Sequence, residues 1–516
     1  MTTPPPQLDR NRVFRDRSAP MIRTLLLVAL FCFSCLAFAV VAKKAHKAIT
    51  GARPKTVAHS KGRSVARGQR SNAPDISPER GTAAAEAAQA TLAETPSAPF
   101  LYPHALDPFF RAVAAQQTQA SGPNALNTIP ALASTVRVLQ FGDSHTAADI
   151  FTGEMRAQLQ GRFGNGGLGF QFPGHPFAGY RLAGSSRSQS SGWFTEGNKF
   201  THLGDGDLGL GGISITANRP GESVTLSTTC STMQVQYLRQ AEGGHLRFTD
   251  NGTFISDIDT SVSQSADAAV GQAGGTSAGT MTYACTPGVH AFELTTLDRA
   301  PVRLLGLVTE QPGITYECLG INGAVAPLML RWNQEIFADY LRERDPNLIV
   351  LAYGTNEAAS GAGMNEEYVE QFNRLLENLH RIVPKAAVLV LGPYDRATRV
   401  GRGRRALWQT FRGTDRIIAD QKEACRIHHC AFYDERQRMG GPGAMIRWVS
   451  AGLAQPDRTH LTGTGYRALA EAFYRDVLGA YKAYQKTAGD AGTVSRVYSF
   501  PADNHIDNSK KEIHHG

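Results

Sequence analysis

Apolar runs that end in short polar turns are the feature that most constrains the fold of this chain. Residues 347–353 form a nearly uninterrupted apolar run, and residues 136–141, 386–391 and 430–434 are similarly rich in apolar or β-forming residues. Runs without polar alternation are typical of parallel strands buried on both faces. Segments with helical apolar spacing, such as residues 368–382, separate these runs. The alternation predicts an α/β fold with right-handed crossovers, whose strands end at one common edge.

A serine follows the first of these runs. The Gly-Asp-Ser-His string at 142–145 lies between the β-rich residues 136–141 and a segment with helical spacing from Thr146 to Leu159. Ser144 is therefore expected on a strand-to-helix turn, where the N–H groups of the helix face a developing negative charge. A serine hydroxyl needs a base before it can act as a nucleophile.

The candidate base lies far along the chain, in a loop before a helix for which Thr462 is the expected N-cap. Asp457 and His460 are three residues apart in this loop. This spacing lets an Asp457 oxygen accept the Nδ1 proton of His460, so that Nε2 can take the Ser144 proton. The alternative is an aspartate that caps a helix beside a surface histidine.

Two further positions are candidate oxyanion donors. Asn356 follows the apolar run 347–353, where its side-chain amide can donate to a tetrahedral oxyanion beside the Ser144 N–H. Gly323 follows another β-like stretch and lets the backbone approach a ligand closely. The alternative for Gly323 is an ordinary turn glycine.

Together, these blocks resemble those of the SGNH (GDSL-like) hydrolases. The resemblance implies a flavodoxin-like three-layer α/β fold without a cofactor. It also implies a catalytic triad and an oxyanion hole: Ser144, Asp457 and His460 form the triad, and Ser144, Gly323 and Asn356 form the hole.

The longer strings at 141–149, 319–324 and 353–358 are similar to the peptidoglycan O-acetylesterase branch. In that branch a carbohydrate-binding-module-like insert separates the first two blocks. His145 stands where the commoner family motif has Leu, and Glu357 stands where it has Asp. Both departures fit the branch.

Three neighbours of the catalytic candidates are candidates for lining the substrate. His145 is expected in a structural or substrate-lining role, because a residue adjacent to the nucleophile on a tight turn usually points away from it. Asn322 and Thr355, next to the two oxyanion candidates, are the other substrate-lining candidates.

The segment between the first two blocks predicts a separate β domain. It is much longer than a βαβ unit of about 30 residues. Residues 175–310 contain alternating strand-like segments separated by Gly, Asn, Asp or Pro, which predicts an inserted antiparallel sandwich. The hydrolase domain is then expected in two parts, 99–174 and 311–486.

The ends of the chain differ from this body. After a short polar segment at 1–23, residues 24–42 carry no charge and are long enough to span a bilayer, which takes about 17–25 residues. They are either a transmembrane anchor or a signal peptide, cleaved near Ala37-Phe38-Ala39. Residues 43–98 are expected to be a flexible tether, and residues 487–516 a disordered tail.

The formal net charge of +8 arises in the amino-terminal segment. Residues 1–70 hold 14 Lys and Arg against 2 Asp and Glu, and the remainder holds 39 against 43. No nucleic-acid partner is therefore expected. One basic cluster follows the run 386–391, and it is either a solvated loop or a contact for carboxylates or phosphates of an envelope polymer. It consists of Arg396, Arg399, Arg402, Arg404 and Arg405.

Seven cysteines are present. In an oxidising compartment, Cys230 and Cys285 could pair across the insert, and Cys425 and Cys430 could join a helix to the next strand, which leaves Cys318 unpaired. No metal site is expected, because the string from Cys425 to Cys430 has no second ligand pair at zinc spacing.

The resemblance implies an esterase that removes O-acetyl groups from a cell-wall glycan, peptidoglycan by resemblance, through a covalent acyl-enzyme. Its expected place is the bacterial cell envelope, periplasmic or otherwise extracytoplasmic, either anchored in the inner membrane or released after signal cleavage. Two alternatives remain open. One is a polysaccharide O-acetyltransferase with the same triad, and the other is a tethered glycan-binding protein with a vestigial hydrolase body.

Overall fold

The computed structural model describes most of the chain after residue 77. The described residues are 78–94, 96, 98–121, 135–199, 201–262, 275–360 and 366–497. The segments expected at 1–23 and 24–42, and the first part of the expected tether, lie outside them. Among the described helices, none is both long and apolar enough to cross a membrane.

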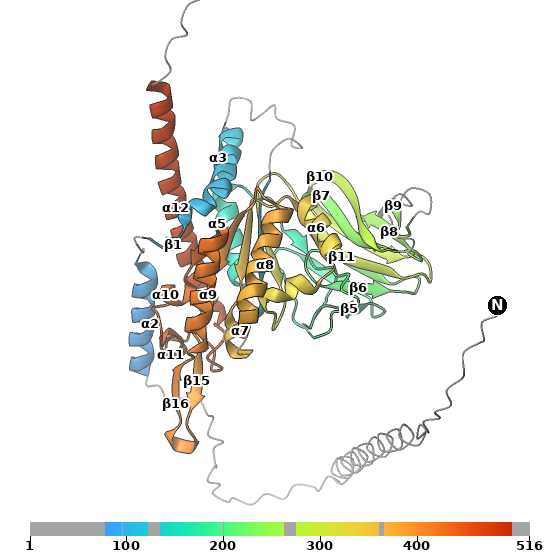
Figure 1. Cartoon of the computed structure of the whole chain (residues 1–516). Coiled ribbons are helices and arrows are strands. Elements are labelled where there is room, and N and C mark those ends of the chain that lie inside the picture. The colour runs from blue at the N-terminus through green and yellow to red at the C-terminus, as the bar shows by residue number, and fades with distance from the viewer. Residues whose placement is uncertain are drawn as a thin grey trace, which may run out of the picture. The chain divides into compact units, whose positions relative to one another are not determined.

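A parallel sheet forms the centre of the α/β part (Figure 1). Its five parallel strands lie in the spatial order β12-β2-β13-β14-β17, and a short antiparallel strand, β1, pairs with β17 at the edge. Counted along the chain, this order is 2-1-3-4-5, as in flavodoxin-like folds. The strands are β1 (Phe100–Leu101), β2 (Val136–Gly142), β12 (Ile314–Gly320), β13 (Leu348–Ala352), β14 (Ala387–Leu391) and β17 (Ala431–Tyr433).

Each face of this sheet is covered by helices, which confirms the predicted three layers. Because side chains alternate along a strand, Val138 and Val350 lie in one apolar cluster while Leu139 and Leu351 lie in the other. The first cluster includes residues of α3 (Asp107–Ser121), α5 (Phe151–Phe163) and α12 (Gly463–Val497). The second includes residues of α6 (Gln334–Arg344), α8 (Glu366–Ile382) and α9 (Gly413–His428).

The insert is an antiparallel sheet of nine strands, to the right of the α/β part in Figure 1. It confirms the predicted all-β insertion. The strands form one hydrogen-bonded sheet with its own apolar core, rather than the predicted sandwich of two sheets. The first strand starts at Gly169 rather than after residue 175. The strands are β3 (Gly169–Gln171), β4 (Ser186–Gln189), β5 (Phe194–Glu196), β6 (Ser214–Ala217), β7 (Ser223–Arg239), β8 (His245–Asp250), β9 (Thr253–Asp259), β10 (Ser277–Thr296) and β11 (Val302–Glu310).

Two segments expected to lack structure are helical. The tether prediction is wrong for α2 (Pro78–Ala93), which buries Ala88 and Leu92 against the body and accepts hydrogen bonds from Arg438 at the carbonyls of Thr91 and Leu92. Alanine, whose abundance suggested a linker, is also the residue with the highest helix propensity. The tail prediction is wrong for residues 487–497, because α12 continues to Val497.

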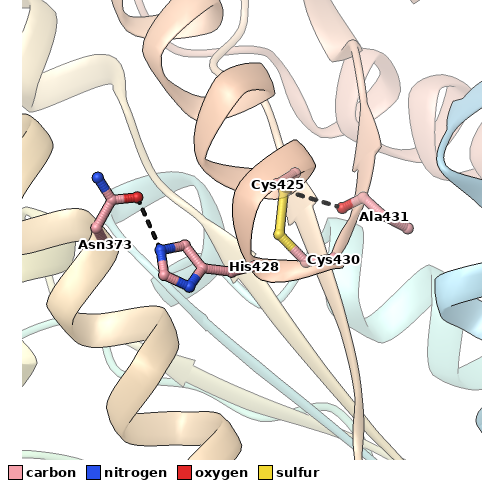
Figure 2. The surroundings of a disulfide bond; sticks show 5 residues. All are labelled: Asn373, Cys425, His428, Cys430 and Ala431. Atoms are coloured by element: carbon pink, nitrogen blue, oxygen red, sulfur yellow. Dashed lines mark hydrogen bonds between the residues drawn. A yellow bond between two sulfur atoms is a disulfide. The ribbon is translucent and has the colours of Figure 1, made fainter.

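One of the two candidate disulfides is formed. Cys425, in α9, is bonded to Cys430, just before β17 (Figure 2). The neighbouring His428 ring lies 3.0 Å from the side-chain oxygen of Asn373 on α8. Among the described residues, no group of three or more His, Cys, Asp and Glu is placed to hold a metal ion.

The other candidate pair is not bonded. The sulfur atoms of Cys230 and Cys285 lie 4.0 Å apart. In the ladder between β10 and β7, Ala284 faces Thr232 and Gly288 faces Cys230, so Cys285 lies in the irregular part between these pairs and is not directly opposite Cys230. Cys318 is free and buried in β12, as expected for the unpaired cysteine.

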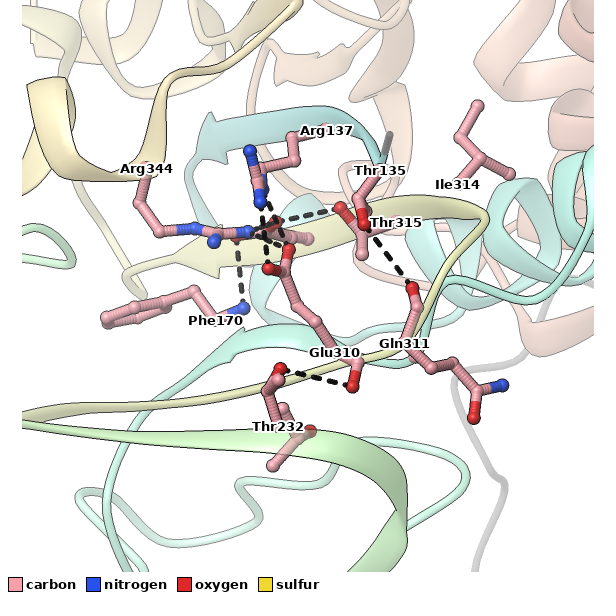
Figure 3. Close-up of polar contacts among 12 residues, drawn as sticks. Thr135, Arg137, Phe170, Thr232, Glu310, Gln311, Ile314, Thr315 and Arg344 are labelled. Atoms are coloured by element: carbon pink, nitrogen blue, oxygen red, sulfur yellow. Dashed lines mark hydrogen bonds and ion pairs between the residues drawn. The ribbon is translucent and has the colours of Figure 1, made fainter. Parts of the chain in front are cut away.

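A buried ionic cluster joins the two sheets (Figure 3). Arg344, at the end of α6, lies 2.8 Å from the carboxylate of Glu310 in β11 and also pairs with Glu317 in β12. Arg137 of β2 lies 2.9 Å from Glu310. Burial alone would raise the pKa of Glu310, but the two arginines outweigh burial and lower the pKa to about 2. Glu310 therefore stays ionised where the insert meets the parallel sheet.

We expect Glu310→Gln to destabilise the fold in a pH-dependent way. The pKa of Glu310 falls from an ordinary 4.5 to about 2 on folding, which corresponds to a contribution of about 3 kcal/mol to the free energy of unfolding. A depressed carboxylate pKa stabilises the fold fully above about 4.5, and this contribution is lost as the pH falls through about 2. Urea unfolding between pH 3 and 7 should show a large difference between wild type and variant at pH 7 and a smaller one at pH 3. Glu293→Gln, at an exposed position of β10, is the control, and an equal effect of both changes would contradict the assignment.

Candidate active site

The segments that carry Ser144, Gly323 and Asn356 leave the parallel sheet at strand ends that are in register with one another. Gly142, the last residue of β2, is in register with Gly320 of β12 on one side and with Ala352 of β13 on the other. Ser144, Gly323 and Asn356 follow these strand ends within a few residues. The order of the strands reverses between β2 and β13, which is where open α/β sheets bind ligands.

The strand ends need glycine because a short helix packs directly on them. A Cβ atom at Gly142 would lie 2.1 Å from the Thr146 hydroxyl oxygen, and one at Gly320 would lie 2.2 Å from the Ala147 nitrogen. Both distances are too short for any side chain. The two glycines therefore let α4 (Ser144–Ala147), which begins with the candidate nucleophile, lie against the sheet edge.

The helix expected from Thr146 to Leu159 is interrupted. It is divided into α4 and α5 at Asp149, which has a left-handed φ of 48°. The Asp149 carboxylate accepts a hydrogen bond from Thr152 at 2.7 Å and pairs with Arg156 at 2.6 Å, so buried polar contacts compensate for the break. Ser144 consequently lies on its own short turn.

Ser144, His460 and Asp457 form a continuous hydrogen-bonded chain. The Ser144 Oγ lies 2.9 Å from His460 Nε2, and His460 Nδ1 lies 2.7 Å from an Asp457 carboxylate oxygen. This is the arrangement in which the histidine takes the serine proton while the aspartate orients the ring. The side chains of His460 and Asp457 are 34% and 46% exposed, so this series of hydrogen bonds is open to solvent.

The loop that presents the base is held by its own backbone. The other carboxylate oxygen of Asp457 accepts hydrogen bonds from the N–H groups of Thr459 and His460, both at 3.0 Å. Burial would raise the pKa of Asp457, but the hydrogen bonds from His460 and these N–H groups lower it below its ordinary value. Thr462 accepts from the Gly465 N–H at 3.2 Å, which confirms the predicted N-cap.

The oxyanion candidates lie around Ser144. Asn356, in the first turn of α7 (Thr355–Ser360), donates its side-chain amide to the Ala324 carbonyl at 2.9 Å, and the same nitrogen is 3.4 Å from the Asp143 carboxylate. Gly323 has a left-handed φ of 77° in the turn that precedes Ala324. The Asn356 amide is thus oriented by the turn that contains Gly323.

A buried glutamate links the two oxyanion segments, and its role was not expected from the sequence. The Glu357 carboxylate accepts hydrogen bonds from the Gly354 N–H at 2.9 Å and the Ala326 N–H at 2.8 Å. Burial raises its pKa to about 7 despite these donors. Glu357 therefore holds the loop after β13 against the turn after β12.

The structure places His145 next to His460, the candidate base. Its ring is buried, its Nδ1 lies 2.7 Å from the Tyr466 hydroxyl, and it packs edge-on against Tyr394 at 4.5 Å. Burial lowers the pKa of His145 to about 3, with a smaller contribution from His460. A neutral ring at 5.1 Å from the His460 ring supports that side chain from behind rather than acting as a second base.

The other two candidates for lining the substrate differ in exposure. Asn322 is exposed on the turn that carries Gly323, so it is available to a ligand. Thr355 is 8% exposed, and its carbonyl accepts a hydrogen bond from Arg396 at 3.3 Å. Thr355 therefore contributes to the support of the site. The support that Tyr394, Tyr466 and Arg396 give to the site was not predicted, because it depends on contacts made only in the folded chain.

One solved structure shares this fold over most of the chain. A peptidoglycan O-acetylesterase of known structure superposes with a TM-score of 0.57 and 24% identity, over 73% of this chain and 96% of its own. The family two carbohydrate esterase of Cellvibrio japonicus superposes with a TM-score of 0.22 and 11% identity, over 58% of this chain and 99% of its own. The family two carbohydrate esterase of Clostridium thermocellum, in complex with cellohexaose, superposes with a TM-score of 0.23 and 12% identity, over 56% of this chain and 100% of its own. No similar curated protein is found.

A family match is found for the part of the chain that follows most of the insert. Residues 284–468 match the GDSL-like Lipase/Acylhydrolase family, a range that includes Gly323, Asn356, Asp457 and His460. Ser144 lies before this range because the insert separates it from the other blocks, yet the fold brings it to His460. Residues 284–468 thus match the GDSL-like lipase/acylhydrolase family that the motifs resemble, and the fold is shared with the peptidoglycan O-acetylesterase structure over 73% of this chain.

Proposed function

We propose that this protein is a carbohydrate esterase of the cell envelope that hydrolyses O-acetyl groups on peptidoglycan. The observation that carries the proposal is the chain from Ser144 through His460 to Asp457 at the edge of the sheet, at 2.9 and 2.7 Å. The solved structure that shares the fold over 73% of this chain is a peptidoglycan O-acetylesterase.

In the proposed reaction, Ser144 Oγ attacks the acetyl carbonyl carbon while its proton moves to His460 Nε2. The Ser144 N–H, the Gly323 N–H and the Asn356 amide stabilise the tetrahedral oxyanion. His460 then protonates the departing sugar oxygen, which leaves an acetyl-serine. Water, deprotonated by His460, releases acetate, and Asp457 stabilises the imidazolium in both steps.

The open position of the triad supports a polymeric substrate. Asp457 is 46% exposed and His460 is 34% exposed, so an ester that projects from a long glycan can reach Ser144 without entering a deep cavity. Two features support the envelope location. One is the uncharged run 24–42, and the other is the disulfide between Cys425 and Cys430, since such bonds persist in oxidising compartments.

Acetate release from O-acetylated peptidoglycan by the purified full-length protein tests the proposal. The assay is run with and without sugar acceptors, and with O-acetylated xylan as the comparison polymer. Acetate released without an acceptor supports the esterase. A product that forms only with an acceptor would instead indicate an O-acetyltransferase. Binding to the polymer without turnover would indicate a glycan-binding protein with a vestigial hydrolase body.

Ser144→Ala should lower the turnover of a small acetyl ester by at least about 10⁴-fold, because no other group supplies the acyl acceptor. The Ser144 side chain is only partly buried and small, so the unfolding midpoint should stay close to that of the wild type. Ser188→Ala in β4 of the insert is the control. Turnover near the wild-type rate in Ser144→Ala would remove this residue from the mechanism.

Asn356→Ala should reduce turnover by about 10²–10³-fold if its amide stabilises the oxyanion. The matched control is Asn218→Ala, because Asn218 is exposed directly after β6 of the insert and has no assigned role in the site. The control should retain the wild-type rate on a small ester. Equal losses in the two variants would assign Asn356 a structural role.

Asp457→Asn should reduce turnover by up to about 10⁴-fold, since the amide favours the wrong imidazole tautomer and removes the charge that stabilises the imidazolium. The measurement uses the same acetyl ester as for Ser144→Ala. A loss under about 10-fold would show that Asp457 mainly shapes the loop through its bonds to the Thr459 and His460 N–H groups.

A further inference from the structure

A basic hairpin lies beside the active site and is not used by the mechanism. The strands β15 (Ala397–Val400) and β16 (Leu407–Thr410) form a two-stranded ribbon that extends away from the body next to α11 (Ala444–Ser450) in Figure 1. Residues 396–414 contain no Asp or Glu and six arginines, which are Arg396, Arg399, Arg402, Arg404, Arg405 and Arg412.

The charge of this hairpin is not neutralised within the fold. Arg399, Arg402 and Arg405 are exposed, and none of the three forms an ion pair with a carboxylate of the described residues. Within the part of the chain that the structure describes, Arg399 donates to the Gly403 carbonyl, at 3.2 Å. Because the chain after residue 70 carries a slight excess of acidic residues, the hairpin is a local positive feature on an otherwise acidic body.

The base of the hairpin contacts both catalytic loops. Arg396 donates to the Thr355 carbonyl at 3.3 Å, directly before the oxyanion residue Asn356. The Ala397 N–H donates to the Arg458 carbonyl at 3.2 Å, between Asp457 and His460. The hairpin is therefore held at a defined position relative to Ser144.

One face of the hairpin is turned toward the catalytic loop. Arg399 and Trp408 are directly opposite each other in the ribbon, so their side chains lie on the same face. The Arg458 guanidinium lies 3.8 Å from the centre of the Trp408 ring. Trp408 remains 38% exposed, so Arg399 and Trp408 offer a positive charge and an aromatic edge beside the triad.

We propose that the hairpin is a subsite that binds carboxylate groups of an acidic O-acetylated glycan while the ester lies at Ser144. Guanidinium groups match carboxylates through paired hydrogen bonds, and peptidoglycan carries carboxylates on its peptides. The inference rests on the proposed function, which it deepens by naming the charge that the substrate polymer must carry. The chemistry at Ser144 does not depend on the subsite.

The test variant is Arg399→Gln/Arg402→Gln/Arg405→Gln in the full chain. The control removes the same charge from three exposed positions elsewhere, as Arg219→Gln/Arg299→Gln/Arg381→Gln. Acetate release is measured on O-acetylated peptidoglycan, on neutral O-acetylated xylan and on p-nitrophenyl acetate, each at low and high salt. The hairpin variant should lose about 10-fold in kcat/KM on peptidoglycan at low salt and nothing on the two neutral substrates. The control should match the wild type on all three.

Binding is measured separately, with Ser144→Ala as the background, so that the subsite is tested even if no glycan is hydrolysed. Retention on de-O-acetylated peptidoglycan that depends on the three arginines supports the subsite whatever the fate of the proposed function. The subsite is overturned if the hairpin variant loses as much kcat/KM on xylan as on peptidoglycan, or if it loses neither kcat/KM nor retention on peptidoglycan. Stronger retention on a phosphodiester glycan, or on phosphatidylglycerol vesicles alone, overturns the assignment to carboxylates.

Discussion

The parallel pairing of β2 with both β12 and β13 is the constraint on which the rest of this structure depends. Gly142 is in register with Gly320 and Ala352, so the segments that follow three different strands leave the sheet side by side. Only this pairing brings the turn after β2 to the loops that supply the oxyanion donors. The insert of nine strands leaves the chain after β2 and returns at β12 without disturbing the pairing.

Buried charges hold the elements around this edge in place. Arg344 joins Glu310 of the insert to Glu317 of the central sheet, and Glu357 joins the two oxyanion segments through backbone N–H groups. A buried carboxylate is costly unless it is paired or hydrogen-bonded. Each of these carboxylates meets its partners only when the surrounding strands are correctly assembled. Such groups favour one arrangement of the two sheets over alternatives with similar apolar burial.

The site separates chemistry from recognition. The hydrogen-bonded series from Ser144 through His460 to Asp457 is short and local, and its supporting groups, such as His145 and Tyr466, are buried behind it. Exposed groups near the triad lie on the Asn322 turn and on the β15–β16 hairpin, where we propose that a long substrate binds. This division lets a family with one catalytic arrangement act on different esters by changing the surface near the triad.

The sequence by itself determined the parallel α/β class, the inserted antiparallel β part and the candidate catalytic residues. It could do so because apolar runs, strand-to-helix turns and the spacing of Asp457 and His460 are local patterns. Tertiary structure alone decided the break at Asp149, the separation of Cys230 from Cys285 and the position of the arginine hairpin beside the triad. These features depend on strand register and on contacts between residues far apart in the chain, where local propensity carries no information.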